Sequence, residues 1–284
     1  MPVNMAAQSL NWMTLLVFTA IAMIGQSVPL PFGNGTHALF ERVQVTDGVC
    51  HDMTRPSATP GNLLCANRDT AAWHDTGQLW TQLGNGFALP ADRHTAVQAQ
   101  LEKFASNPGN IEQILQRGKP WLHHIVSEIR QRGLPMELAL LPVIESAFDP
   151  FARSPRNAAG LWQFMPATAR EFGLQQDGWY DGRRDVIAAT AAALDYLTRL
   201  RQRFDGDWLL ALAAYNAGPA RVQRAIRHNR DSGKSADFWH LQLPKETRDY
   251  VPKLLALRAL IETPQHYGLK LPAVPATRQF AVVD

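Results

Sequence analysis

Cysteine is scarce in this sequence, which has only Cys50 and Cys65 among its 284 residues. The two form neither a C-x-x-C motif nor the spacing of a zinc site, and no H-E-x-x-H helix surrounds any of the nine histidines. We therefore expect no metal and no other cofactor. In an exported chain the even count permits one disulfide, and two unpaired thiols fit the sequence equally well.

Long apolar runs are also missing. Residues 12–24 form a largely apolar run of 13 residues, shorter than the roughly 20 that cross a membrane and typical of a signal-peptide core. No Lys or Arg precedes this run, and no clear A-x-A cleavage site follows it before Gln26. We predict a signal peptide or an uncleaved membrane anchor over residues 1–27.

Charge is low, at 19% of residues with a formal net charge of +3, whereas 46% of residues are hydrophobic. This balance excludes disorder as the default state and predicts a well-buried core. Residues 179–258 carry a local excess of basic side chains, with 14 Lys or Arg against 9 Asp or Glu. Such a surface suits an anionic polymer, namely cell-wall glycan, nucleic acid or a lipid headgroup layer, and it also fits an ordinary solvated face.

No alternating strand pattern of useful length occurs, so the folded part is expected to be mainly α-helical. Pro120, Pro135, Pro166 and Pro219 stand at expected first-turn positions, and Asp185 and Asp207 at expected N-caps. We divide the chain into a poorly ordered linker over 28–75, a short helical extension over 76–130, the main helical domain over 131–265 and a tail over 266–284. Pro142 is expected to kink or break the helix that starts at Pro135.

Glu145 is the candidate general acid. Leu138, Leu141, Glu145 and Phe148 follow one another at helical spacings, which places a carboxyl group on an apolar face. Desolvation disfavours the charged form, so such a group stays protonated near neutral pH and can donate a proton. The other interpretation is that Glu145, close to the end of its helix, turns outward into water.

Three further clusters have compositions that core packing does not require. They are the GLWQFMP loop over residues 160–166, the AYNAG segment over 214–218, and Tyr250 on the apolar side of the last helix. Amides and phenols that bind sugar hydroxyl and N-acetyl groups, with aromatic rings against sugar faces, form a carbohydrate groove. Each cluster also has a structural interpretation, since Asn216 suits a helix stop, Trp162 and Phe164 suit the core, and Tyr250 suits simple ring burial.

Taken together in this order, these motifs resemble the catalytic domain of the lytic murein transglycosylases. The resemblance rests on Glu145-Ser146, the GLWQFMP loop, AYNAG and the segment that runs from Glu246 through Tyr250, and it covers roughly residues 79–262. It implies a lysozyme-like helical domain of the soluble lytic transglycosylase type, with residues 131–265 as the catalytic domain. It also implies a place in the cell envelope of a Gram-negative-type bacterium, periplasmic or associated with the membrane.

The resemblance implies that Glu145 protonates the glycosidic oxygen between N-acetylmuramic acid and N-acetylglucosamine and then acts as a base. Its substrate-binding residues would be Ser146, Gln163, Met165, Tyr215, Asn216 and Tyr250. Ser146 and Tyr250 would steer Glu145 or the N-acetyl group, and Tyr215 would lie beside the carboxylate. The sugar's own 6-hydroxyl would attack the anomeric carbon, so the product would be a 1,6-anhydro sugar. The implied partner is the peptidoglycan glycan strand, alone or with other cell-wall proteins.

Three alternatives follow from the residues. A muramidase would hydrolyse the same bond with a second carboxylate, for which Asp149, Asp181 and Asp185 are candidates. A wall-binding protein would keep the groove without turnover. A nucleic-acid binder would use Arg221, Arg224, Arg227 and Arg230, but the predicted export signal removes the chain from nucleic acid, so we expect no nucleic-acid partner.

Overall fold

The computed structural model describes residues 78–90, 93–274, 277, 279 and 280. The predicted signal segment 1–27, the predicted linker 28–75 and both cysteines lie outside these residues. The described residues fall within one compact unit, residues 72–284, to which this description is confined.

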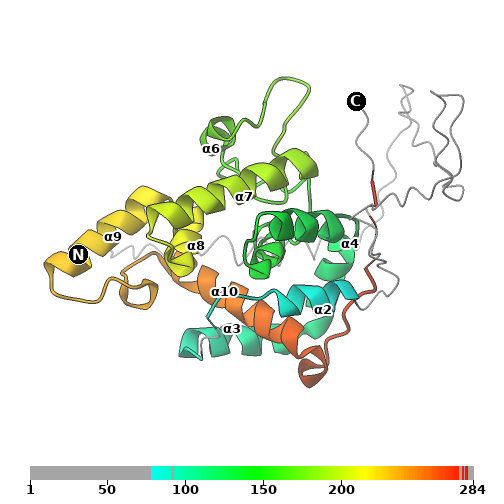
Figure 1. Cartoon of the computed structure of the whole chain (residues 1–284), viewed down its shortest axis with the longest axis horizontal. Helices are drawn as coiled ribbons and strands as arrows, with labels where there is room; N and C mark the ends of the chain where they lie inside the picture. Colours follow the sequence, from blue (N-terminus) through cyan, green and yellow to red (C-terminus); the bar gives the residue numbers. More distant parts are fainter. Residues whose placement is uncertain (1–77, 91–92, 275–276, 278, 281–284) are drawn as a thin grey trace, which may run out of the picture. The chain divides into compact units, whose positions relative to one another are not determined.

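The described part of the chain is built from helices, which confirms the mainly α prediction (Figure 1). The α-helices are α2 (Gln78–Asn85), α3 (Thr95–Ala105), α4 (Pro108–Gln131), α5 (Leu141–Ser146), α6 (Pro166–Glu171), α7 (Val186–Arg203), α8 (Trp208–Ala217), α9 (Pro219–Asp231) and α10 (Lys245–Glu262). Short 3-10 helices are η1 (Met136–Leu140), η2 (Phe238–His240) and η3 (Pro264–Tyr267). No helix in the described ranges has both the length and the apolar character needed to span a membrane.

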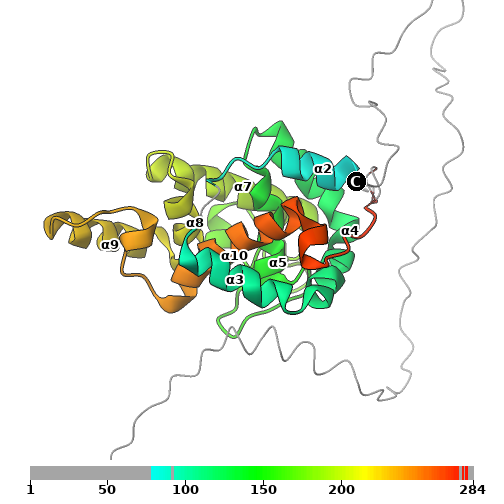
Figure 2. The ribbon, with the colours of Figure 1, turned by 90° about the horizontal axis from the view of Figure 1, so that it is seen from below.

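Helix α10 is central to the packing. It contacts α3 most extensively, and it also packs against α8, α2, α5 and η1 (Figures 1 and 2). The side chains along most of its length are buried, among them Tyr250, Leu254 and Leu257, each at most 2% exposed. Elements from both ends of the described chain therefore meet on one helix.

The predicted helix boundaries are confirmed at the N-cap aspartates of α7 and α8 and at the glycine that ends α8. The Asp185 side chain accepts hydrogen bonds from the N–H groups of Ile187 and Ala188 at the start of α7, and that of Asp207 accepts one from Leu210 at the start of α8. Gly218, with φ of 86°, ends α8, and Pro219 begins α9. The chain therefore follows these capping residues as the sequence predicted.

The prediction that Pro120 starts a helix is wrong. Pro120 lies inside α4, a single helix of 24 residues that begins after the N-cap Asn107. Buried apolar side chains occur on both sides of the proline, including Ile114 and Leu115 before it and Leu122 and Ile125 after it. Continuous burial of this stripe stabilises the helix across the missing N–H.

The segment that leads to Glu145 also differs from the predicted single helix. A 3-10 helix occupies Met136–Leu140, and α5 then begins at Leu141 with Pro142 in its first turn. Proline suits this position because its missing N–H would have no partner there. The expected break at Pro142 is confirmed, and the element that carries Glu145 is only six residues long.

Glu137 forms a buried link that holds α10 against this segment. Its carboxyl group accepts the N–H groups of Ala88, at 3.1 Å, and Leu89, at 2.8 Å, and its Oε1 lies 3.4 Å from Nη1 of Arg258 in α10. Arg258 also donates to the carbonyl of Leu89. Burial raises the pKa of Glu137, while the two N–H groups and Arg258 oppose that rise.

Replacing Glu137 with Ala should lower the free energy of unfolding by about 3–5 kcal/mol, because the buried N–H of Leu89, the N–H of Ala88 and the largely buried Arg258 side chain lose their acceptor. Glu262→Ala is the matched control, since Glu262 pairs with the same Arg258 at 3.1 Å but is more exposed, and it should cost less than about 1 kcal/mol. Urea unfolding of both variants measures the difference. Equal losses of unfolding free energy in the two variants would show that the link through Glu137 contributes no more than the exposed pair of Glu262 and Arg258.

Candidate functional site

The Glu145 carboxyl group is oriented by a tight turn at the end of α5. Ala147 and Phe148 both have left-handed backbone conformations, with φ of 51° and 58°, and the Phe148 N–H bonds to the Pro142 carbonyl at 3.0 Å. The Phe148 ring is fully buried against Gly118 of α4, where an added Cβ would lie 2.6 Å from the ring. Packing of Phe148 therefore compensates for the strained turn and fixes the direction of Glu145.

Tyr250 of α10 contacts Glu145 directly. Its hydroxyl donates a hydrogen bond to Oε1 of Glu145 at 2.6 Å. Glu145 is half-buried, and desolvation raises its pKa to about 7, with a further rise from the charge of Glu246; the Tyr250 hydrogen bond and Lys253 oppose the rise. Of the two interpretations of Glu145, the structure supports the desolvated carboxyl group, which is poised to give and take a proton near neutral pH.

Tyr215 and Ser146 bind the loop over residues 160–166. The Tyr215 hydroxyl donates to the carbonyl of Trp162 at 2.8 Å, and the Ser146 hydroxyl donates to the carbonyl of Leu161 at 3.0 Å. Burial and the nearby charge of Glu145 raise the pKa of Tyr215 well above its usual value, so it stays a donor. The hydrogen bond that reaches Glu145 itself comes from Tyr250.

Gln163 and Met165 lie on that loop. The Gln163 amide donates to the carbonyls of Gly160, at 2.9 Å, and Ala152, at 3.3 Å, and its backbone is left-handed with φ of 48°. Met165 is 43% exposed and precedes α6. By contrast Trp162 and Phe164 are buried at 0% and 2% exposure, which supports their interpretation as core residues.

Asn216 joins the end of α8 to the start of α10. Its Nδ2 donates to Oε1 of Glu246 at 3.4 Å, and its Oδ1 accepts from the Thr247 hydroxyl at 2.7 Å. The structure thus brings Glu145, Tyr250 and Tyr215 together, with Asn216 linked to the same helix through Glu246.

Glu246 and Lys253 were not predicted as site residues. With Tyr250 they stand at spacings of four and three along α10, so the three side chains share one face of the helix. The charge of Glu246 raises the pKa of Glu145, and that of Lys253 lowers it. The resemblance placed Tyr250 of this face beside Glu145, but it assigned no role to the charges of Glu246 and Lys253.

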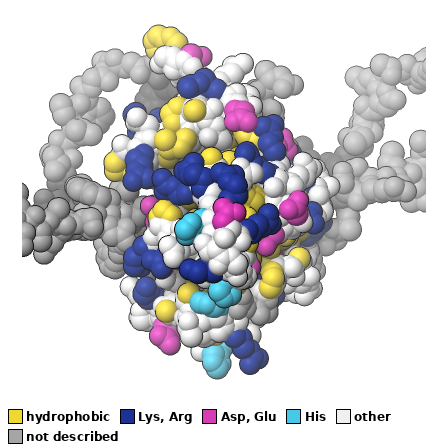
Figure 3. Space-filling view, turned by 90° about the vertical axis from the view of Figure 1, so that its left-hand side faces the viewer, with side chains coloured by type: hydrophobic (Ala, Val, Ile, Leu, Met, Phe, Trp, Pro, Cys, Tyr) yellow, Lys and Arg dark blue, Asp and Glu magenta, His cyan; other side chains and the backbone are white. Residues whose placement is uncertain are grey.

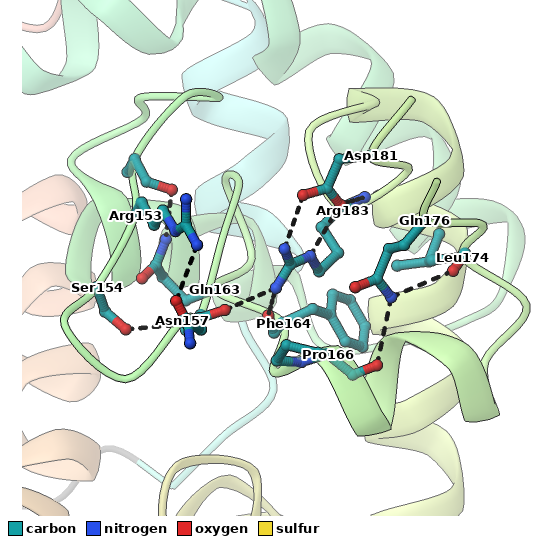
Figure 4. Close-up of polar contacts among 12 residues, drawn as sticks. Arg153, Ser154, Asn157, Gln163, Phe164, Pro166, Leu174, Gln176, Asp181 and Arg183 are labelled. Carbon is teal, nitrogen blue, oxygen red and sulfur yellow. Dashed lines mark hydrogen bonds and ion pairs between the residues drawn. The ribbon is translucent and has the colours of Figure 1, made fainter. Parts of the chain in front are cut away.

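The three candidates for a second carboxylate make local contacts instead. The Asp149 side chain accepts the N–H of Phe151 at 2.9 Å. Asp181 pairs with Arg183 at 2.7 Å, and Asp185 caps α7 and accepts the Tyr180 hydroxyl at 2.9 Å. Asp181 and Asp185 therefore hold a loop and a helix start, as Figure 4 shows for Asp181 and Arg183.

Basic side chains gather on the face that Figure 3 presents, which includes the end of the molecule formed by α9. The predicted stripe of Arg221, Arg224, Arg227 and Arg230 lies on the exposed side of α9. Among the described residues, no group of three or more His, Cys, Asp or Glu is arranged to hold a metal ion.

Comparison with known proteins gives three findings. The family model described as the transglycosylase SLT domain matches residues 125–238. Over 207 residues the chain is 45% identical to membrane-bound lytic murein transglycosylase D of Escherichia coli (strain K12). The aligned residues make up 73% of this chain and 46% of that protein. Over 150 residues it is 43% identical to a protein of Alteromonas sp. (strain M-1) named for tributyltin chloride resistance. That alignment makes up 53% of this chain and 72% of that protein.

Among solved structures, the chain is similar to lytic transglycosylase Slt of Pseudomonas aeruginosa, with a TM-score of 0.39 and 24% identity over 68% of this chain and 33% of that one. The chain spans about half the length of the E. coli transglycosylase that it matches.

Tyr250→Phe should raise the pKa of Glu145 by about one pH unit above its value of about 7, because a hydrogen bond to the charged carboxylate is lost and about 1.4 kcal/mol corresponds to one pH unit. Carbon-13 NMR titration of labelled glutamate, with the Glu145→Gln protein identifying the signal, measures the pKa. Tyr215→Phe is the matched control, since its hydroxyl donates to Trp162 instead, and it should change the pKa much less. A lower pKa in Tyr250→Phe would contradict the assigned donor.

Proposed function

The chain belongs to the family of proteins with a transglycosylase SLT domain, and from this membership we propose that it is a lytic transglycosylase that cleaves peptidoglycan. The bond cut is the β-1,4 link between N-acetylmuramic acid and N-acetylglucosamine, without hydrolysis. The catalytic domain is residues 131–265, and the protein acts on glycan strands in the cell envelope. The name of the E. coli relative supports both the activity and the location.

The observation that carries this proposal is the desolvated carboxyl group of Glu145, with its pKa near 7 and its contact to the Tyr250 hydroxyl. In the first step the Glu145 proton passes to the glycosidic oxygen as the bond from that oxygen to the anomeric carbon breaks. The muramic acid N-acetyl group stabilises the positive charge on that carbon. The 6-hydroxyl oxygen of the same sugar then bonds to the anomeric carbon, and its proton returns to Glu145.

The surrounding residues have supporting roles in this proposal. The Tyr250 hydroxyl orients the Glu145 carboxyl group through its hydrogen bond and stabilises the carboxylate that forms after proton transfer. Tyr215 and Ser146 hold the loop with Gln163 and Met165 next to α5, so that the loop can bind the sugar. Asn216 presents its amide beside Glu246.

A hydrolytic muramidase is the second candidate function, because Glu246 is a second carboxylate that acts electrostatically on Glu145. The two reactions differ in their products, since transglycosylation leaves 1,6-anhydro ends and hydrolysis leaves reducing ends. Mass spectrometry of soluble fragments released from purified peptidoglycan decides between them. Fragments lighter by one water support transglycosylation; reducing fragments, lost in Glu246→Gln, would establish hydrolysis.

Glu145→Gln should lower the rate of fragment release about 100- to 10,000-fold, because the amide keeps the shape of the side chain and cannot transfer the proton. A rate equal to that of the parent would exclude Glu145 as the acid, and murein binding without turnover in the parent itself would indicate a wall-binding protein.

Thermal unfolding tests whether the Glu145→Gln protein is folded. The difference in stability between this variant and the parent should also change with pH in a definite direction. The pKa of Glu145 is raised in the folded state, from 4.5 to about 7, so its ionisation destabilises the fold as the pH rises through this range. The Gln variant lacks that ionisation. It should therefore gain stability relative to the parent between pH 5 and pH 8, and a relative loss over this range would contradict the raised pKa.

A further inference from the structure

The large apolar side chains that are exposed to solvent come from one stretch of the chain. Among the described residues they are Phe151, Met165, Trp179 and Tyr180, and all four lie in the segment between α5 and α7. Trp179 is fully exposed, at 102% of the reference area. A fully exposed indole is a candidate for ligand contact, because left in water it gives no stability to the fold.

Trp179 sits at the tip of a loop that is held rigidly. Oδ1 of Asp177 accepts the N–H groups of both Trp179 and Tyr180 at 2.8 Å. A β-bridge joins Gln176 to Asp181 below the tip, and the Tyr180 hydroxyl bonds to Asp185. The backbone that presents the indole is therefore ordered before any ligand arrives.

The same loop is joined to the loop that carries Gln163 and Met165. Nη1 of Arg183 donates to the carbonyls of Asn157, at 2.6 Å, and Phe164, at 3.3 Å, while its other nitrogens bind Asp181 (Figure 4). The backbones approach so closely at Gly160 that an added Cβ would lie 1.7 Å from the Arg183 carbonyl oxygen. The Arg183 contacts thus fix the base of the Trp179 loop relative to the loop assigned to substrate in the proposed function.

We propose that Trp179 is an additional sugar-binding residue, whose indole stacks on a pyranose ring of the glycan strand away from the bond that Glu145 cleaves. This inference rests on the proposed function. The face of a pyranose presents C–H groups, which pack on a flat aromatic ring, and its edge presents hydroxyl groups to water. A rigid, exposed indole suits this ligand because little conformational entropy is lost on binding.

The distribution of charge favours a sugar over an anionic surface as the occupant. Residues 149–185 contain five arginines and five carboxylates, so this region has no net charge, and Arg183 is already paired with Asp181. Helix α9 differs in that its four exposed arginines stand against a single carboxylate, Asp231. An anionic membrane or a nucleic acid would be attracted to α9, whereas a ring that stacks on Trp179 needs no charge.

The test is steady-state cleavage of peptide-free glycan strands by the full chain and its Trp179→Ala variant. We expect KM to rise about tenfold and kcat to stay within about twofold, because the contact is made equally before and during bond cleavage. Trp179→Phe should restore most of the affinity, since it keeps an aromatic face. Asp177→Ala, which retains the indole but removes the acceptor that orders the tip, should give an intermediate KM.

Two measurements separate this inference from the proposed function and from a folding defect. The melting temperature of Trp179→Ala should equal that of the parent because the indole is fully exposed. The second measurement is co-sedimentation with insoluble peptidoglycan, made on the Glu145→Gln protein with and without the Trp179→Ala substitution. It measures binding in the absence of turnover. If the parent releases no fragments, the proposed function fails, and a loss of pelleting on Trp179→Ala would still support the sugar contact.

Unchanged KM and unchanged pelleting in Trp179→Ala would overturn the inference. Other occupants would then be identified directly. Sedimentation velocity would show a parent dimer that Trp179→Ala dissociates if the indole binds a second copy of the chain. Flotation with vesicles that contain anionic phospholipid would show lost binding if the indole enters a membrane.

Discussion

Where α5 meets α10, the half-buried carboxyl group of Glu145 accepts a hydrogen bond from the Tyr250 hydroxyl at 2.6 Å, and desolvation raises its pKa. Such a group stays reactive near neutral pH only while both its desolvation and its donor are kept in place. Helix α5 has only six residues, and a helix this short is not stable without tertiary contacts. The position of Glu145 therefore depends on the elements that enclose it, and above all on α10.

Those elements constrain α10 from several sides. Helices α3 and α8 cover its length, and Arg258 ties its C-terminal half to Glu137 and to the backbone at Leu89. A buried ion pair of this kind has a large desolvation cost, and it stabilises the fold only because hydrogen bonds satisfy both partners. Its contribution here is to set where α10 lies against η1, the element that immediately precedes α5.

The loops between α5 and α7 show a second constraint, the use of backbone carbonyls as fixed acceptors. Ser146, Tyr215 and Arg183 donate to the carbonyls of Leu161, Trp162 and Phe164, respectively. Three distant parts of the chain thus hold one loop while leaving Met165 exposed. A binding loop secured in this way can present side chains to a long polymer without reorganising when the polymer binds.

Much of the fold was predictable from the sequence because its signals are local. Asp185 and Asp207 cap helices through N–H groups two or three residues away, and Gly218 ends α8 through its own φ angle. Glu145 was also predictable as the candidate acid, but with two interpretations of its surroundings. The continuation of α4 through Pro120 was not predictable, because it follows from the burial of both halves of the helix rather than from the residues at the proline.

The sequence by itself determined the helical class, most helix ends and the identity of the candidate acid, since each depends on residues a few positions apart. The tertiary structure decided the protonation behaviour of Glu145, because its pKa is set by burial and by Tyr250, which is 105 positions away in the chain. It also decided that Glu246 and Lys253 act on Glu145 and that Glu137 is buried against Arg258. Electrostatic interactions depend on distance in space and on exclusion of water, and neither quantity is encoded in the local spacing of residues.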